Sequence, residues 1–385
     1  MPEYPPPKPR AHPLHAPSLP PRPAPHPSVS YCDLHVTSNF TFLTGASHPD
    51  ELVRRAASLG HTAAAITDCN TLAGVVRAHV AAKECGIRLA VGSRIQTRPA
   101  EGTPALSILL FPTDRASYGR LCRLLTLGKR RAPQGECHLS LHDVVEHSEG
   151  MLGVVLPPRT LDERFIEVLE GLRAHFSKDD RLSLAAWRQF GPDDEDRLRQ
   201  LGDLAAHVRV PLVATNDVLY DVPERRALQD LLTCIRHGCT LEQAGRLLRP
   251  HAERHMKPPE EMLRLFSSQP WAARAVARSA EIALRASAFS LDQLRYEYPD
   301  EVIPKNTTAM QHLTELTWKG ARERYPAGVP PKVSSQILHE LKLIDELQYA
   351  HYFLTVHDIV TKARGMIGPD GYPILCQGRG AAPNS

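Results

Sequence analysis

The sequence predicts an α/β protein built on a barrel of alternating strands and helices. Short apolar runs and amphipathic stretches follow each other from Tyr31 to Thr215. Polar residues gather directly after several of the apolar runs, and 42% hydrophobic content in 385 residues allows a substantial core. Strands separated by helices, repeated this often, favour a parallel βα barrel over a sandwich or a helical bundle.

The elements of this barrel follow from their boundary residues. Ser47-His48-Pro49-Asp50 has the composition of a helix start, and Gly60 is expected to end that helix. Strands are expected at 62–67, 87–91, 105–111, 151–156 and 211–215, with a further apolar run at 182–187. Helices are expected at 71–85, 114–127, 140–147, 161–175 and 194–207.

Helices also dominate the prediction beyond the barrel. They are expected at 224–237, 269–287, 309–324 and 335–347, and through Phe353 and Val360. The helix at 269–287 is rich in alanine and arginine, so contact with DNA phosphates is one interpretation. Arg274, Arg278 and Arg285 are only partly in helical register, and a solvated face is the favoured one.

Composition limits the classes of function. A net charge of +3 permits a nucleic-acid partner without implying one. Eight cysteines without a Cys-x-x-Cys pair indicate neither a disulfide framework nor a zinc ribbon, and fit a reducing compartment. No stretch approaches eighteen uninterrupted apolar residues, so we expect a cytoplasmic protein without a membrane partner.

Residues 1–28 form a separate compositional unit. Proline fixes φ and has no N–H, so this proline-rich segment is predicted to be an extended, disordered leader. It has no hydrophobic core of the kind that a signal peptide needs.

Polar residues follow the predicted strands at the edge where a barrel carries its chemistry. They are Asp33-x-His35, Thr67-Asp68-Cys69-Asn70, Gly92-Ser93-Arg94 and Thr215-Asn216-Asp217. Ligands from several strand ends can converge on a metal. For Asp68 and Asp217 taken singly, a helix N-cap is the favoured alternative.

The last stretch, Ile374 to Ser385, ends in the turn Gly378-Arg379-Gly380. Two glycines leave backbone N–H groups open to an anion, and the arginine between them offers a planar fork of donors. Taken alone, such a triplet is most often an ordinary surface turn.

Several motifs in order carry a resemblance to bacterial C-family DNA polymerases. Tyr31 to Ile95, with DLHVTSNFTFLTGASHPDELV, AITDCNTLAGVVRAHVAAKECGI and VGSRI, resembles their polymerase and histidinol phosphatase (PHP) domain. Thr215-Asn216-Asp217-Val218 is similar to a later motif of that domain. LRYEYPDEVIP, HYFLTVHDIVTKAR and ILCQGRG resemble the start of an α+β polymerase palm, most closely in the error-prone, translesion type.

The resemblance implies a degenerate metal site. Of the aligned ligand positions only His35 and Asp217 keep the family's ligand, and the others are occupied by Thr37, Thr44, Cys69, Arg94 and Leu219. Cys69 could ligate zinc as a thiolate, although a buried, inert thiol is favoured. We therefore expect a structural PHP domain whose metal positions, His35, Asp217 and Cys69, are empty.

In the palm-like region the resemblance implies that Gly378, Arg379 and Gly380 cradle the triphosphate of an incoming deoxynucleotide. Ala381 stands where the family has a serine, and Pro383 removes a backbone N–H donor. Residues 366–372 resemble an insertion relative to the family. We therefore expect weaker binding of the triphosphate. The catalytic aspartates that hold Mg²⁺ are expected beyond Ser385.

Three functional hypotheses follow. The first is the amino-terminal portion of an error-prone DNA polymerase, a nucleotidyltransferase acting in damage-induced mutagenesis. Its partners would be primer–template DNA and deoxynucleoside triphosphates, with a sliding clamp and accessory mutagenesis proteins as further candidates. The second is a non-catalytic module that binds nucleotide, DNA or a partner. The third and least favoured is a free-standing phosphoesterase. The expected organisation is a leader at 1–28, a PHP-like barrel with trailing helices at 29–285 and a partial palm at 286–385.

Overall fold

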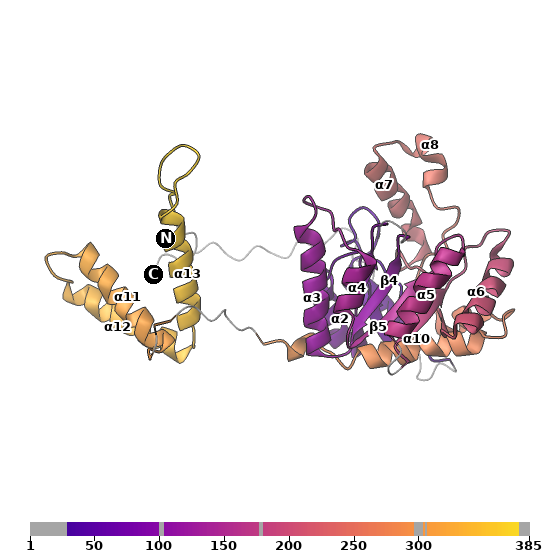
Figure 1. The fold of residues 1–385 in the computed structure, drawn as a ribbon, viewed down its shortest axis with the longest axis horizontal. Helices are drawn as coiled ribbons and strands as arrows, with labels where there is room; N and C mark the ends of the chain where they lie inside the picture. Colours follow the sequence, from indigo (N-terminus) through magenta and orange to yellow (C-terminus); the bar gives the residue numbers. More distant parts are fainter. Residues whose placement is uncertain (1–28, 100–103, 177–179, 296–302, 305, 377–385) are drawn as a thin grey trace. The chain divides into compact units, whose positions relative to one another are not determined.

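The computed structural model describes residues 29–99, 104–176, 180–295, 303–304 and 306–376. The chain divides into two compact units between Leu294 and Arg295 (Figure 1), whereas the sequence was expected to divide at 285/286. The predicted leader and the Gly378-Arg379-Gly380 turn lie outside the described residues. No helix in the described part of the chain has the length and apolar character needed to cross a membrane.

Seven strands build the first unit. Their bounds are β1 Ala63–Ile66, β2 Arg88–Val91, β3 Ser93–Gln96, β4 Ser107–Pro112, β5 Met151–Leu156, β6 Leu182–Ala186 and β7 Leu212–Ala214. β1 pairs with β2, and β3 to β7 form a second sheet in chain order. Gly92 lies between β2 and β3, and its N–H donates to Ile66 O at 3.2 Å. The Arg94 N–H continues this pairing to Asp68 O, so that the two sheets join through a bent strand.

Residues 31–37 close the barrel between β7 and β1. On one side the Val218 N–H donates to His35 O at 2.8 Å, and the Thr37 N–H donates to Val218 O at 2.9 Å. On the other side the Thr67 N–H donates to Val36 O at 2.8 Å, and the Val36 N–H donates to the Thr67 hydroxyl at 2.9 Å. Closure removes the free sheet edges, which confirms the expected βα barrel.

The expectation that all the strands run parallel is wrong for β4. It pairs antiparallel with both β3 and β5, whereas β1–β2, β5–β6 and β6–β7 are parallel. No helix separates β3 from β4 among the described residues, and a chain that returns without a crossover helix must run antiparallel.

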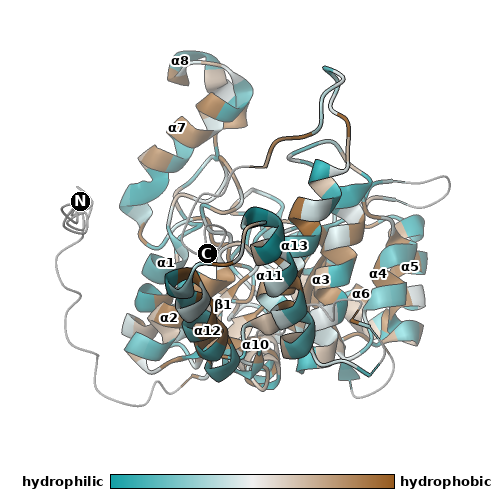
Figure 2. Cartoon of the chain, turned by 90° about the vertical axis from the view of Figure 1, so that its left-hand side faces the viewer, coloured by the Kyte–Doolittle hydropathy of each residue, from teal (hydrophilic) through white to brown (hydrophobic). Residues whose placement is uncertain are grey.

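Helices cover the outside of the barrel and continue beyond its last strand. Around the barrel they are α1 Pro49–Ser58, α2 Val75–Cys85, α3 Arg115–Arg130, α4 Leu141–His147, α5 Glu163–His175 and α6 Asp194–Val208. After β7 follow α7 Arg226–His237, α8 Leu241–Ala244, α9 Pro259–Leu265 and α10 Ala272–Ala286. α7 and α8 stand away from the barrel in Figures 1 and 2, and hydrophobic and hydrophilic residues alternate along the covering helices in Figure 2.

Helix α10 packs against the barrel at the end opposite the polar strand ends. Its Ile282, Ala283 and Ala286 share one buried cluster with inward-facing strand residues such as Leu109 and Val154. The Cys32 N–H, at the start of the closing segment, donates to the Ser279 hydroxyl at 3.1 Å. Helix α10 thereby closes one end of the barrel. A functional site is expected at the other end, where the strands have their carboxyl ends.

The expectation of a solvated face on this helix is wrong for Arg278. Its side chain is 8% exposed and its guanidinium contacts Asp180 Oδ2 at 2.6 Å and Glu281 Oε1 at 2.8 Å. Nε also donates to the Ser183 hydroxyl at 3.2 Å. Arg278 therefore ties α10 to the loop before β6 and to β6 itself.

In the second unit the described residues form α11 Ala309–Arg324, α12 Pro331–Glu346 and α13 Ala350–Arg364. Leu313, Leu341 and Leu354 meet in its small core. After α13 the segment expected as an insertion folds back on itself, since Ile367 bridges Pro373 and the Gly368 N–H donates to Tyr372 O at 2.7 Å. This segment is thus a tight hairpin that leads to Ile374.

Candidate functional site

His35 and Asp217 lie together at the carboxyl end of the barrel. His35 is in the closing segment and Asp217 follows β7, and the pairing of Val36 with Val218 brings them side by side. His35 Nε2 lies 3.2 Å from Asp217 Oδ1, with side chains only 3% and 12% exposed. Trp187, after β6, packs edge-on against the His35 ring. His35 and Asp217, two of the three residues proposed from the sequence as metal positions, therefore lie in contact with each other.

Two arginines occupy the space around this pair. Arg254 Nη1 contacts Asp217 Oδ2 in a buried ion pair. Arg94, on β3, places Nη1 3.5 Å from His35 Nε2. Arg249 adds positive charge nearby, and burial, followed by the charge of Arg94, holds the pKa of Arg249 below its usual value. Guanidinium groups thus take the place that a cation would need.

The electrostatics are those of a cation-filled pocket. Burial, followed by the charges of Arg94 and Arg254, holds the pKa of His35 well below its usual value, so the imidazole is neutral. Burial together with Arg94 lowers the pKa of Arg254 to about 10, which still leaves it charged at neutral pH. Asp217 is the carboxylate that contacts the Arg254 guanidinium and the His35 ring directly.

These residues do not fit a metal ion. Among the described residues no three His, Cys, Asp or Glu side chains are grouped as metal ligands. Arg254 contacts one carboxylate oxygen of Asp217 and His35 approaches the other. A divalent cation would have to displace Arg254 and sit beside Arg94, against strong charge repulsion.

The neighbouring aspartates hold the loops together. Asp68 accepts hydrogen bonds from the Ser38 N–H at 2.8 Å, the Ser38 hydroxyl at 2.7 Å and the Thr41 hydroxyl at 2.8 Å. Asp33 accepts from the His35 and Asn216 N–H groups, and burial raises its pKa to about 6. The N-cap interpretation is wrong for Asp68 and Asp217, because the N-cap of α2 is Gly74 and Asp217 pairs with Arg254.

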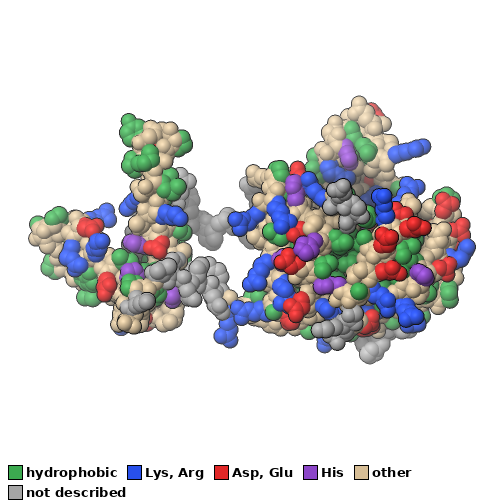
Figure 3. All heavy atoms as spheres, in the orientation of Figure 1, with side chains coloured by type: hydrophobic (Ala, Val, Ile, Leu, Met, Phe, Trp, Pro, Cys, Tyr) green, Lys and Arg blue, Asp and Glu red, His purple; other side chains and the backbone are tan. Residues whose placement is uncertain are grey.

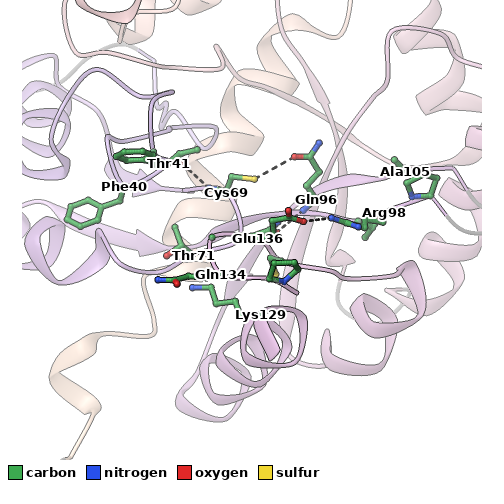
Figure 4. A pocket seen from close by; sticks show the side chains of 17 residues that line it. Phe40, Thr41, Cys69, Thr71, Gln96, Arg98, Ala105, Lys129, Gln134 and Glu136 are labelled. Atoms are coloured by element: carbon green, nitrogen blue, oxygen red, sulfur yellow. Dashed lines mark hydrogen bonds and ion pairs between the residues drawn. The ribbon is translucent and has the colours of Figure 1, made fainter. Parts of the chain in front are cut away.

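Cys69 lies apart from the His35–Asp217 pair. Its thiol approaches Gln96 Oε1 at 3.7 Å, and its backbone pairs with Arg94. The expectation of a buried thiol is wrong, since Cys69 is only partly buried and lines a cavity of about 790 Å³. Figure 4 shows Cys69 in this cavity, between Thr41 and Gln96.

The sequence reasoning missed Arg254 and the cavity. Arg254 lies in an irregular stretch between α8 and α9, and its partner Asp217 is 37 residues away. No local spacing pattern marks such a pair. The pairing of Tyr220 with His255 aligns the two segments, and the Leu219 N–H donates to Arg254 O at 2.9 Å, which brings the arginine to the barrel mouth.

Comparison with known proteins shows which families the chain resembles. Residues 33–180 match the PHP domain, and residues 311–385 match the bacterial DNA polymerase III alpha NTPase domain. The error-prone DNA polymerase of Caulobacter vibrioides is 51% identical over 355 residues. This chain corresponds to the amino-terminal part of error-prone DNA polymerases.

The extent of the match is the same in other relatives. Error-prone DNA polymerase 1 of Agrobacterium fabrum is 46% identical, and both alignments cover 92% of this chain and 31% of the relative. The chain therefore spans about a third of the length of these error-prone polymerases. A solved structure described as a metal-dependent phosphoesterase, from Bifidobacterium adolescentis, is 19% identical with a TM-score of 0.37, over 50% of this chain and 88% of that one.

Proposed function

We propose that the chain is the amino-terminal portion of an error-prone DNA-directed DNA polymerase that extends primers across damaged template. One observation carries the proposal: the 51% identity extends over 92% of the chain and thus through both structural units. The substrates are then primer–template DNA and deoxynucleoside triphosphates. Damage-induced mutagenesis in the cytoplasm, with a sliding clamp and accessory mutagenesis proteins as partners, belongs to the same proposal.

Within that polymerase the barrel serves as a structural, non-hydrolytic domain. The support is the contact of Arg254 with Asp217 and the place of Arg94 beside His35. An activated water needs a metal or a strong base, and this site offers a neutral imidazole and a carboxylate already paired. Phosphoester hydrolysis is thus disfavoured.

The second unit prepares the nucleotide site. Gly378, Arg379 and Gly380, which follow the described hairpin, are proposed to contact the triphosphate. Mg²⁺ is proposed to act with carboxylates beyond Ser385, in the part of the polymerase that this chain does not span.

The experiment is primer extension on a template with one abasic site. A protein made from the gene together with its in-frame downstream sequence should extend the primer past the lesion in the presence of Mg²⁺, and the 385-residue chain should not. In the long protein, Arg379→Ala should raise the KM for deoxynucleotide more than it lowers kcat, with Arg364→Ala as the control on the preceding helix. Templated synthesis by the chain alone would contradict the assignment of the catalytic carboxylates.

The second candidate is a non-catalytic binding module. The observation that favours it is the cavity of about 790 Å³ beside the arginine site, which is large enough for a small ligand. If the downstream DNA begins with a stop codon and the chain accumulates in cells as such, this function takes precedence.

A further inference from the structure

The cavity beside Cys69 has two walls from different parts of the barrel mouth. In Figure 4, Phe40 and Thr41 lie on one side and Gln96 and Arg98 on the other, with Cys69 between them. Its floor includes Lys129, at the end of α3, and the loop that follows. The complete lining is Phe40, Thr41, Phe42, Cys69, Asn70, Thr71, Gln96, Thr97, Arg98, Pro99, Ala105, Lys129, Pro133, Gln134, Gly135, Glu136 and Cys137.

The loop that carries the two phenylalanines is held firmly from beneath. The Thr41 hydroxyl accepts from the Cys69 N–H at 3.0 Å while it donates to Asp68. Gly45 allows this turn, because a Cβ there would lie 2.2 Å from Ser38 O. Phe42 is nevertheless 81% exposed and Phe40 39% exposed. Exposed aromatic rings on a fixed loop are suited to stacking with a planar ligand.

The opposite wall presents hydrogen-bond donors. The Asn70 side-chain oxygen accepts from the Gln96 N–H at 3.1 Å, which leaves the Asn70 amide NH₂ directed elsewhere. Gln96 uses its amide oxygen as an acceptor for the Cys69 thiol, so its NH₂ group also remains a donor. Gln134 is exposed at the cavity and adds a third side-chain amide.

The charge of the lining is positive on balance. Glu136 is held by Arg98 at 2.5 Å and by His138 at 2.8 Å. Among the described residues no hydrogen bond or ion pair engages the Lys129 ammonium, while the Lys129 carbonyl accepts from the Ala132 N–H, so the ammonium is available at the cavity floor. Figure 3 shows basic and acidic side chains intermixed on one face of this unit, which makes a local, directed cation more informative than the net charge.

We propose that this cavity binds one nucleotide unit of a single-stranded nucleic acid, with the base stacked on Phe42 and Phe40 and the phosphate held by Lys129. The side-chain amides of Asn70, Gln96 and Gln134 then contact polar edges of the base or sugar. A volume of about 790 Å³ accommodates a nucleotide, whereas a lone inorganic phosphate would leave the aromatic wall unused. The proposal does not rest on the polymerase assignment, because every contact lies in the first unit.

The first test uses the two thiols of the lining as reporters. Cys69 and Cys137 are partly buried free cysteines at the cavity, and Cys239 is a partly buried free cysteine outside it. The full chain is alkylated with iodoacetamide, with and without an oligothymidine of about ten nucleotides, and each cysteine is quantified by mass spectrometry. Saturating oligothymidine should slow the alkylation of Cys69 and Cys137 at least fivefold and leave Cys239 unchanged.

The outcome also separates sources of the ligand. Protection by thymidine triphosphate without protection by the oligomer would show that the cavity binds a free nucleotide and not a nucleic-acid strand. That result would overturn the proposal. Binding of the oligomer that leaves both thiols reactive would place its site elsewhere and overturn it as well. Protection by a peptide of mixed sequence, equal to that by the oligomer, would indicate a protein partner instead.

The second test compares variants by fluorescence anisotropy of a labelled oligothymidine. Phe42→Ala should weaken binding by about tenfold, because base–aromatic stacking contributes strongly to single-strand affinity. Lys129→Gln should reduce the slope of log K against log salt by about 0.7, the loss of one phosphate contact. The matched controls are Ile235→Ala, 57% exposed on α7, and Arg130→Gln, next to Lys129 but outside the lining.

Both changed residues lie at the surface, so the fold should survive, and equal melting temperatures would verify this. Binding of both variants with wild-type affinity and salt dependence would contradict the proposal. A cavity that binds single-stranded nucleic acid would give the chain a contact with DNA that is independent of the polymerase site.

Discussion

The guanidinium of Arg254 contacts one carboxylate oxygen of Asp217, while His35 lies 3.2 Å from the other. Both carboxylate oxygens of Asp217 are thereby in contact with neighbouring side chains. This relationship changes a site that resembles a metal centre into a buried ion-pair network, and it gives the first prediction.

Replacing Arg254 by Met should destabilise the first unit by about 3–5 kcal/mol, because Asp217 would remain as an unpaired buried charge. The double variant Arg254→Met/Asp217→Asn should recover most of this loss. Urea unfolding followed by circular dichroism measures both. Arg264→Met is the control, since its pair with Glu261 is exposed and should contribute at most about 1 kcal/mol. Equal costs for Arg254→Met and Arg264→Met would show that the buried pair does not stabilise the barrel.

The purified chain should hold well under one equivalent of zinc or manganese after dialysis against either metal. The reason is that a cation at Asp217 would meet the charges of Arg94 and Arg254. Plasma mass spectrometry gives the metal content, and release of nucleotides from a primer end gives the activity. One bound equivalent that disappears in Asp217→Asn, accompanied by metal-dependent release, would establish a working site.

His61 should make the first unit less stable at acidic pH. It is 6% exposed, its Nε2 lies 2.8 Å from Lys257 O, and burial lowers its pKa to about 4. The folded pKa is below the unfolded value of 6.5, so the unfolded chain binds the proton more readily. This contribution is complete above pH 6.5 and is lost as the pH falls towards 4.

From pH 7 to pH 5 the loss attributable to His61 should be about 2 kcal/mol. In His61→Gln the unfolding free energy should change by that much less over the same interval, while His142→Gln, at an exposed position, should follow the wild type. An unchanged pH dependence in His61→Gln would mean that the pKa of this imidazole is the same in the folded and the unfolded chain.

Leu354 should stabilise the second unit alone. It is 1% exposed and meets Leu313 and Leu341 in the core of the three helices. Leu354→Ala should cost about 2–5 kcal/mol, whereas Leu343→Ala, at a residue 46% exposed, should cost much less. Calorimetry should show one lowered transition for Leu354→Ala and an unchanged transition for the barrel. A fall of both transitions together would show that the two units unfold cooperatively.

Elements with strong periodicity and clear ends could be predicted from the sequence. The strand expected at 151–156 is β5 and the helix expected at 309–324 is α11, with the same bounds. Helix α2 begins at Val75, later than the expected 71, because Leu72 O accepts the Val75 N–H in a turn before it. Local residue choice determines such boundaries only within a turn.

Features that depend on long-range pairing could not be predicted. β3 was missed because it is a short, partly polar strand whose pairing with β4 becomes visible only in space. Arg94 could be identified because it stands at a ligand position of the family, whereas nothing local distinguishes its neighbour Arg254 from a surface arginine. Likewise the cavity combines residues from six separate runs of the sequence between Phe40 and Cys137, and no one of them carries a recognisable motif.

The closing segment of the barrel sets a limit on how far the chain can be shortened. Tyr31, Cys32, Leu34 and Val36 are each 0% exposed, and the backbone of residues 31–37 pairs with Thr67 after β1 and with Val218 after β7. A start point placed after this segment would leave two open edges and remove His35 at the same time. Any start codon or amino-terminal proteolytic cut that preserves the barrel must therefore lie before Tyr31.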